Sequence, residues 1–165
     1  MQAQKKGVVV ATAAAMRLMG GRVARSITTE APGERARVVA LCGDLGAGKT
    51  TFTQGFLKQI GVKRRIISPT FLIIRPYKIK AKNFNRAFHI DCYRLNKASE
   101  IINLGLKEIL KDPKHIVLIE WPELVKKYLP KEARWIKIGH PEKGTQRVVS
   151  YSPFPKGSTR RGRDF

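Results

Sequence analysis

The sequence predicts an α/β fold in which helices flank a mixed, mainly parallel central sheet. Two observations support this prediction. Short apolar segments rich in β-branched residues alternate with segments whose apolar residues recur at helical spacing. One nearly continuous apolar segment, residues 115–120, is typical of a strand that is covered on both faces. At 165 residues the chain is long enough for one domain with a substantial core.

Strands and helices are expected to alternate over most of the chain. The first part of the chain is expected to form an edge strand at 7–11, a helix at 13–26 capped by Thr12, a turn at 28–36, a buried strand at 37–41 and a helix at 51–60 that Gly61 ends. The middle part is expected to form an edge strand or hairpin arm at 72–79, a strand at 87–91 and a helix at 98–110. The last part is expected to form a strand at 115–120, a short helix from Pro122 to Tyr128, and two strands at 134–138 and 147–151 around a turn at 141–145. Pro76 confines its strand to an edge, and the pair Gly20-Gly21 weakens the first helix.

The domain is expected to cover residues 1–151. Residues 152–165 contain Pro, Gly, Ser and Arg with little apolar content, so we expect a basic, disordered tail.

Residues 43–50 match the phosphate-binding pattern G-x-x-x-x-G-K-[ST] between a predicted strand and a predicted helix. Glycines let backbone N–H groups surround a phosphate, and the following helix adds its positive dipole terminus. We therefore expect a P-loop that binds ATP, with Lys49 on the β- and γ-phosphates and Thr50 on Mg²⁺. The expected nucleotide-binding residues here are Gly43, Asp44, Leu45, Gly46, Ala47, Gly48, Lys49, Thr50 and Thr51. The alternative, a glycine-rich turn, gives no reason for Lys and Thr at these positions.

Two carboxylates follow predicted strands, Asp91 and Glu120. Ligands in open α/β sheets bind at the carboxyl ends of strands, so both acids are candidates for magnesium and hydrolysis chemistry. The alternative is a helix cap or a strand-end charge. Residues 68–70 (Ser-Pro-Thr) are either a segment that senses the γ-phosphate or an ordinary turn. His89 is interpreted as a packed or hydrogen-bonded strand residue, and Arg94 as either a charge stabiliser or a surface charge.

The charge balance is strongly basic, since 33 Lys and Arg residues against 12 Asp and Glu give a formal net charge of +21. Such a surface attracts nucleic acid and other polyanions; a generally basic proteome or solubility would explain it equally well. Cys42 and Cys92 are expected to be small buried thiols in a reducing compartment. The N-terminus imitates a secretion signal, an interpretation we reject because an ATP site needs cytosolic nucleotide. We expect a cytoplasmic protein without membrane contact.

Four motifs together resemble one protein family. They are GDLGAGKTT at 43–51, SPTF at 68–71, HIDCYRL at 89–95 and IEWPE at 119–123. Their order and spacing are similar to those of the TsaE (YjeE) family, small bacterial P-loop ATPases needed for the threonylcarbamoyladenosine modification of tRNA. The resemblance covers roughly residues 7–151, although residues 11–21 match loosely and carry over no adenine contacts.

The resemblance implies roles for individual residues. Thr50 and Glu120 would be the protein ligands of Mg²⁺, and Asp91 would act in hydrolysis together with Glu120 and Lys49. Ser68 and Thr70 would belong to the first switch. Two further nucleotide contacts, both on the nucleotide side, would be made by Glu123 and Gly144.

The resemblance also implies partners. These would be the TsaD and TsaB proteins, whose complex transfers the threonylcarbamoyl group, while ATP hydrolysis by the TsaE subunit resets or remodels that complex. Direct tRNA contact through the basic surface is an additional hypothesis. Two other functions remain open: a small P-loop kinase, which would yield a phosphorylated metabolite, and an RNA-binding module whose affinity would fall steeply with salt and ignore ATP.

Overall fold

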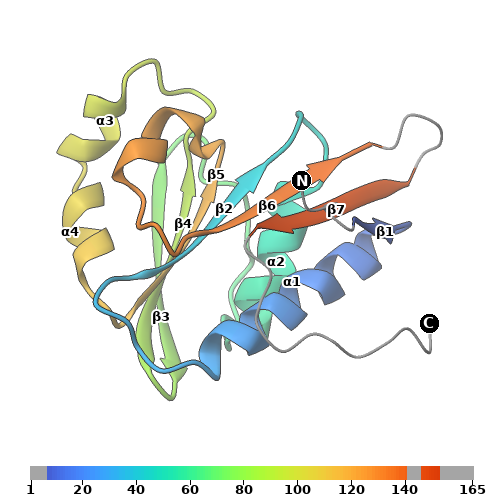
Figure 1. The fold of residues 1–165 in the computed structure, drawn as a ribbon, viewed down its shortest axis with the longest axis horizontal. Coiled ribbons are helices and arrows are strands. Elements are labelled where there is room, and N and C mark those ends of the chain that lie inside the picture. Colours follow the sequence, from blue (N-terminus) through green and yellow to red (C-terminus); the bar gives the residue numbers. More distant parts are fainter. Residues whose placement is uncertain (1–6, 141–145, 153–165) are drawn as a thin grey trace, which may run out of the picture.

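The computed structural model describes residues 7–140 and 146–152, and its centre is a seven-stranded sheet (Figure 1). Its strands lie in the order β1-β7-β6-β2-β5-β4-β3. The strands are β1 (Val8–Val10), β2 (Arg37–Cys42), β3 (Ile74–Ala81), β4 (Phe84–Asp91), β5 (His115–Glu120), β6 (Arg134–Gly139) and β7 (Arg147–Ser152). The four central strands pair in parallel, and β1, β7 and β3 pair antiparallel. The predicted mixed, mainly parallel sheet is therefore confirmed, with β1 and the Pro76-containing β3 at its two edges.

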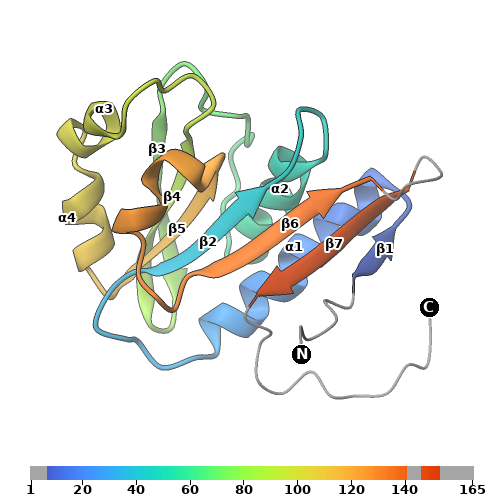
Figure 2. The same cartoon turned by 45° about the horizontal axis from the view of Figure 1, so that its top comes forward.

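Helices cover both faces of this sheet (Figure 2). They are α1 (Ala13–Thr28), α2 (Lys49–Gln59), α3 (Ala98–Asn103), α4 (Leu106–Lys111) and the 3-10 helix η1 (Pro122–Tyr128). Val39 and Leu41 of β2 pack in the cluster that contains α1 and α2, whereas Val38 packs in the cluster that contains α3, α4 and η1. Successive strand residues point to opposite faces, so the apolar run of each central strand is explained by burial on both sides.

The crossing of α1 and α2 depends on two glycines. A Cβ at Gly20 would lie 2.1 Å from the carbonyl oxygen of Phe52, and a Cβ at Gly55 would lie 1.9 Å from that of Arg17. Only glycine permits backbones to approach so closely. The expectation that Gly20 and Gly21 weaken the first helix was incomplete, because α1 runs through both residues and uses Gly20 for packing.

The single helix predicted at 98–110 is wrong. The segment forms two short helices, α3 and α4, because Gly105 adopts a left-handed conformation with φ 93° between them. The apolar spacing continues across the break, since Ile101, Leu106 and Leu110 are all buried in the same cluster. Periodicity alone therefore gave no sign of the interruption.

The register of the central strands brings their carboxyl ends to one edge of the sheet. Asp91, the last residue of β4, is the register partner of Glu120, the last residue of β5. Glu120 is in turn the register partner of Leu41 of β2, two residues before the predicted phosphate loop. The three segments that carry the candidate site are therefore neighbours.

Two predictions fall on other parts of the chain. Gly144 and the proposed tail from residue 153 onward lie outside the described residues, while β7 reaches Ser152. In the part of the chain that the structure describes, no helix is both long enough and apolar enough to cross a bilayer.

Candidate nucleotide site

The predicted phosphate loop connects β2 to α2 and makes a tight turn. Gly43, Gly46 and Gly48 have positive φ values of 141°, 74° and 109°. Gly43 has a second constraint, because a Cβ there would lie 2.1 Å from the carbonyl oxygen of Ile138 on β6. Gly48 is the N-cap of α2, and because glycine has no side chain, no side-chain hydrogen bond caps this helix. The loop therefore ends at a helix N-terminus, where unpaired N–H groups and the helix dipole favour an anion.

Lys49 is the first residue of α2 and is only 4% exposed. Its ammonium donates to the carbonyl oxygens of Gly43, at 2.7 Å, and Asp44, at 2.8 Å. The same nitrogen lies 3.9 Å from the ring centroid of Trp121. Burial lowers the pKa of the Lys49 ammonium, and the nearby carboxylates, Glu120 foremost, oppose that shift. The cation is thus held at the loop by acceptors and by an aromatic face.

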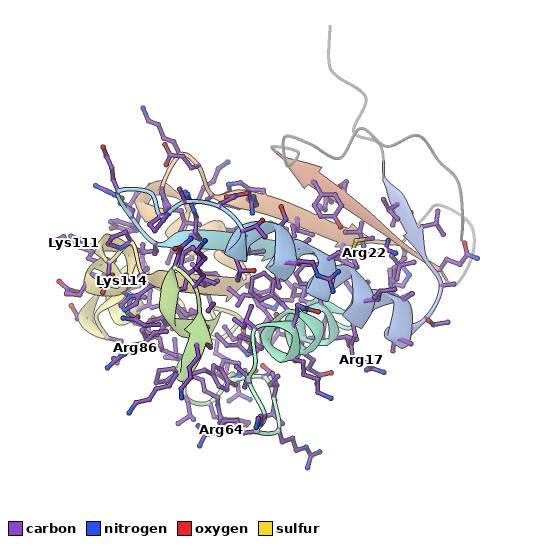
Figure 3. The ribbon with its side chains drawn as sticks, turned by 90° about the horizontal axis from the view of Figure 1, so that it is seen from below. Arg17, Arg22, Arg64, Arg86, Lys111 and Lys114 are labelled. Carbon is purple, nitrogen blue, oxygen red and sulfur yellow. The ribbon has the colours of Figure 1, made fainter. Side chains whose placement is uncertain are left out.

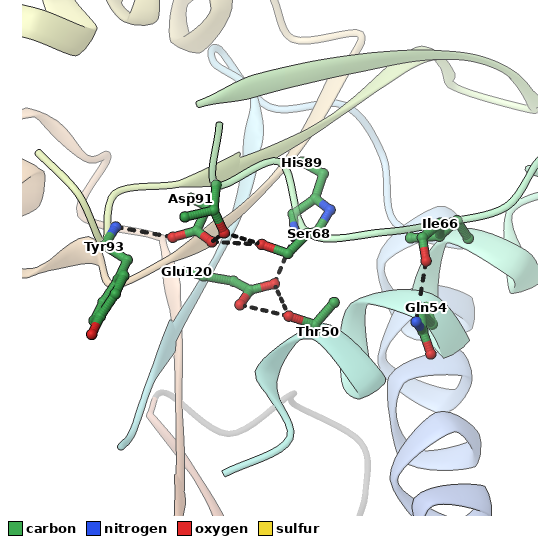
Figure 4. A network of polar contacts seen from close by, with 9 residues as sticks. Thr50, Gln54, Ile66, Ser68, His89, Asp91, Tyr93 and Glu120 are labelled. Atoms are coloured by element: carbon green, nitrogen blue, oxygen red, sulfur yellow. Dashed lines mark hydrogen bonds and ion pairs between the residues drawn. The ribbon is translucent and has the colours of Figure 1, made fainter. Parts of the chain in front are cut away.

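Glu120 is contacted from two sides (Figure 4). The Thr50 hydroxyl lies 3.1 Å and 3.0 Å from its two carboxylate oxygens, and Nε2 of His89 lies 2.7 Å from Oε1. A carboxylate can only accept, so the contact favours the His89 tautomer that carries its proton on Nε2. Glu120 and His89 are 2% and 0% exposed. The sequence interpretation of His89 as a hydrogen-bonded strand residue is confirmed, but it missed that the partner is Glu120.

Asp91 is held by the segment at residues 68–70. Its Oδ2 accepts from the hydroxyls of Ser68, at 2.7 Å, and Thr70, at 2.8 Å, and its Oδ1 accepts from the backbone N–H of Tyr93 at 2.9 Å. The two hydroxyls are also 2.6 Å from each other. Figure 4 shows this network beside the contact between Thr50 and Glu120. A buried carboxylate with three donors has a fixed orientation.

The backbone at this site departs twice from ordinary geometry. Ile73, three residues after Thr70, has φ 61°, and Trp121, directly after Glu120, has φ 57°. Such values are unfavourable for bulky or β-branched residues, and strained residues of this kind cluster at functional sites. The strain at Trp121 accompanies its contact with Lys49, and the Ile73 carbonyl accepts from the Asp91 N–H at 2.9 Å.

A cavity of about 310 Å³ lies among these groups. It is lined by Leu45, Gly46, Gly48, Lys49, Thr50, Thr51, Ser68, Thr70, Asp91, Tyr93, Glu120 and Trp121. A second hollow of about 200 Å³ shares Gly46, Gly48 and Thr51 with it and continues past Thr12 and Met16 to Arg147. The two hollows therefore meet along the loop.

Some predicted residues lie beside the cavity and do not line it. Gly43 and Asp44 contribute carbonyl oxygens to Lys49, and Ala47 is buried under the loop in the second hollow. Glu123 is exposed and lies close to Cys42. Burial raises the pKa of the Cys42 thiol to about 12, and the negative charge of Glu123 is the second cause of this shift. Burial also raises the pKa of the Cys92 thiol to about 12. Cys92 is buried as expected, but Cys42 is only half-buried, contrary to expectation.

Tyr93 and Trp121 line the cavity, although neither was selected as a site residue from the sequence. Their ring centroids are 5.0 Å apart; Tyr93 is exposed and Trp121 is partly buried. Their sequence positions could have indicated this, because Tyr93 lies two residues after Asp91 and Trp121 lies one residue after Glu120. Arg94, by contrast, does not line the cavity; its guanidinium lies 4.2 Å from the Phe71 ring centroid.

The oxygen donors at this site suit Mg²⁺. This ion prefers hard oxygen ligands and is usually bound by one or two protein groups together with phosphate oxygens and water. The Thr50 hydroxyl and the Glu120 carboxylate provide such a pair at the helix N-terminus. Among the described residues, no group of three or more His, Cys, Asp or Glu side chains could hold a metal ion. The site therefore suits an ion that takes its other ligands from phosphate and water.

A strand, a glycine loop and a helix, with acids at the tips of neighbouring parallel strands, define the class of P-loop nucleotide-binding proteins. Comparison with known proteins gives the family. The model of "Threonylcarbamoyl adenosine biosynthesis protein TsaE" matches residues 10–149, so the chain belongs to the TsaE family.

Individual relatives agree with this assignment. The chain is 43% identical over 101 residues to a Bacillus subtilis protein named tRNA threonylcarbamoyladenosine biosynthesis protein TsaE, a match that covers 61% of this chain and 60% of that protein. A Rickettsia conorii protein of the same name is 45% identical over 93 residues, which cover 56% of this chain and 50% of the relative. The crystal structure of Bacillus subtilis YdiB superposes with a TM-score of 0.68 and 26% identity, covering 92% of this chain and 87% of that one.

Proposed function

We propose that this protein is a magnesium-dependent ATPase that serves as an accessory subunit in the threonylcarbamoyladenosine modification of tRNA. The observation that carries the proposal is the meeting of Thr50, Glu120 and Asp91 around a phosphate loop. Family membership supplies the pathway, since relatives carry that biosynthesis in their names. The matched segments cover 60% and 50% of those relatives' lengths, so the role of the whole protein is part of the proposal.

In this proposal the loop amides and Lys49 bind the phosphates of ATP. The ammonium of Lys49 already lies at the loop, where it needs only a side-chain rotation to exchange carbonyl acceptors for phosphate oxygens. The nucleoside end would occupy the adjoining hollow near Thr12, Met16 and Arg147, because this hollow shares three loop residues with the first.

Thr50 and Glu120 would hold Mg²⁺, with His89 fixing the orientation of the carboxylate. When bound, the ion neutralises negative charge on the phosphates. Asp91 would orient the attacking water or accept its proton. Because Ser68 and Thr70 bond to Asp91, a γ-phosphate that attracts either hydroxyl would alter the position of both the acid and the segment at 68–71.

The proposed partners are the TsaD and TsaB proteins in the cytoplasm, where ATP and tRNA are both present. The transferase chemistry would belong to their complex, and ATP hydrolysis by this subunit would reset the complex between rounds. This division of labour would account for a site whose lining includes Lys49, Thr50 and Glu120.

A reconstituted reaction tests the proposal. A TsaB–TsaD complex supplied with this protein should modify many tRNA molecules per complex, and Lys49→Ala should limit the reaction to about one round, since the loss of a phosphate-binding cation removes hydrolysis. Multiple rounds with the Lys49→Ala protein, shown by circular dichroism to be folded, would overturn the assignment.

The kinase alternative is less well supported. Kinases stabilise the transferring phosphoryl group with positioned cations, often arginines, whereas no arginine is among the described residues that line the cavity. Product analysis separates the two functions, because free phosphate indicates an ATPase and a phosphorylated metabolite indicates a kinase.

A further inference from the structure

A larger cavity of about 560 Å³ lies at the free edge of the sheet, along β3. Its lining comes from the turn after α2 and from the paired strands β3 and β4: Gly61, Val62, Lys63, Arg64, Pro76, Tyr77, Lys78 and Arg86. None of these residues lines the cavity beside the phosphate loop. It is therefore a separate feature that the proposed ATPase activity does not explain.

The charge of this region has one sign. Four of the eight lining residues are Lys or Arg, and none is acidic. Between Asp44 and Asp91 the sequence contains no acid at all but ten Lys and Arg residues. Figure 3 shows Arg64 and Arg86 on one side of the molecule, with Lys111 and Lys114 beyond Arg86. Further cations therefore lie on the surface beyond the cavity, although Asp112 stands between the two lysines in the sequence.

Two of these cations face each other without an acid between them. Lys78 of β3 and Arg86 of β4 are direct register partners, and both are exposed. Like charges at opposed positions destabilise a strand pair. Neither residue forms an ion pair with a carboxylate in the described part of the chain. An anionic ligand that contacts both would remove the repulsion.

One residue of the cavity wall also carries a buried hydroxyl without a hydrogen-bond partner among the described residues. Tyr77 is 3% exposed, and its hydroxyl has no hydrogen-bond partner among the described residues. Burial raises the pKa of this hydroxyl, an effect that Arg75 and Arg64 oppose, so the group stays protonated near neutral pH. An unpaired buried hydroxyl is unfavourable, and because Tyr77 belongs to the cavity wall, we infer that an anion bound there serves as its acceptor.

We propose that this cavity binds a backbone phosphate of RNA and that the surrounding cations contact adjacent phosphates. A single phosphate carries at most about two negative charges, fewer than the four cations that line the cavity, so a polymer matches this surface better than a small phosphorylated molecule does. The choice of RNA rests on the proposed function, which supplies tRNA as the polyanion; the binding itself does not require the ATP site.

An anisotropy titration with a fluorescent, unmodified tRNA transcript over a series of KCl concentrations tests this. Replacing Lys78 and Arg86 by Ser should weaken binding about tenfold and reduce the slope of log affinity against log salt by roughly 1.4 to 1.8, because two phosphate contacts are lost. The matched control replaces Lys97 and Lys131 by Ser; both are exposed, and neither lines the cavity. This control should change the affinity for tRNA less than about twofold. Equal effects of the two pairs would overturn the proposal.

Tyr77→Phe tests the cavity itself without changing charge. It should weaken tRNA binding by roughly tenfold, as expected for one hydrogen bond to a charged group, while leaving thermal stability intact. Unchanged affinity would exclude the cavity from the interface.

Inorganic phosphate should displace the tRNA no better than chloride at equal ionic strength; full displacement would indicate a small phosphate ligand and overturn the RNA proposal. ATP hydrolysis, measured on the same proteins, should be unaltered, so failure of the two proposals can be told apart.

Discussion

Glu120 receives its orientation from two residues far from it in sequence. Thr50 approaches the carboxylate from α2 and His89 approaches from the neighbouring strand β4. Nδ1 of His89 has no hydrogen-bond partner among the described residues, so the ring makes one polar contact and makes it to the acid. We therefore assign His89 a positioning role within the proposed magnesium site.

Replacement of His89 should change the magnesium requirement more than the fold. His89→Ala is expected to raise the Mg²⁺ concentration for half-maximal ATP hydrolysis by roughly 10- to 100-fold, the usual effect of losing a residue that orients a metal ligand. His89→Gln, whose amide can still donate to the carboxylate, should recover part of the loss. The measurement is a magnesium titration of phosphate release at saturating ATP.

A purely structural role for His89 makes a different prediction. In that case both variants would lower the melting temperature and the yield of folded protein, and the magnesium requirement of the remaining active molecules would equal that of the unaltered protein.

Single residues show where sequence reasoning stops. The positions of Glu120 and Asp91 could be expected from the strand-end rule, because a pattern of apolar residues followed by an acid is local. The hydrogen bonds from Ser68 and Thr70 to Asp91 join residues 23 and 21 positions apart, and only the packed sheet places them together.

At the scale of elements, the close crossing of α1 and α2 fixes the base on which the phosphate loop stands, because α2 begins directly at that loop. Helix propensity and packing make opposite predictions for the glycines of α1. Alanine is favoured over glycine by up to about 1 kcal/mol in a helix, but a Cβ at Gly20 would overlap backbone atoms of α2.

Two neighbouring substitutions separate these effects. Gly20→Ala should lower the free energy of unfolding by about 1 to 3 kcal/mol, because a rigid backbone must move to admit the methyl group. Gly21→Ala should be neutral or stabilise by up to about 1 kcal/mol, since its nearest neighbour, Oε1 of Gln59, is a comfortable 3.5 Å away. Urea unfolding measures both; equal effects would show that packing at Gly20 is not limiting.

Elements whose signals are local were predictable. The strands at 37–41 and 115–120 appear in the structure as β2 and β5 with nearly the expected bounds, and Gly61 ends α2 with a positive φ of 91°. The break at Gly105 was not predictable from periodicity, because a left-handed glycine can interrupt a helix without disturbing the apolar face on either side.

For the whole molecule, the strand order could be expected only in outline. Alternating strands and helices indicate a parallel core, but they do not say that β2 lies between β5 and β6 or that β3 forms the far edge. That order matters for function, because it brings the tips of β2, β5 and β4 together at one end and leaves the basic cavity at the edge near β3.

We propose above that Thr50 and Glu120 form a magnesium site at the phosphate loop. A calorimetric titration with ATP, done once with Mg²⁺ and once with EDTA, measures the contribution of this site to ATP binding. We expect Mg²⁺ to strengthen ATP binding to the unaltered protein and Glu120→Gln to reduce this gain by at least about tenfold. Binding in EDTA should be nearly the same for both proteins. An identical gain in ATP affinity on adding Mg²⁺ to the folded Glu120→Gln protein would show that Glu120 does not take part in a magnesium site.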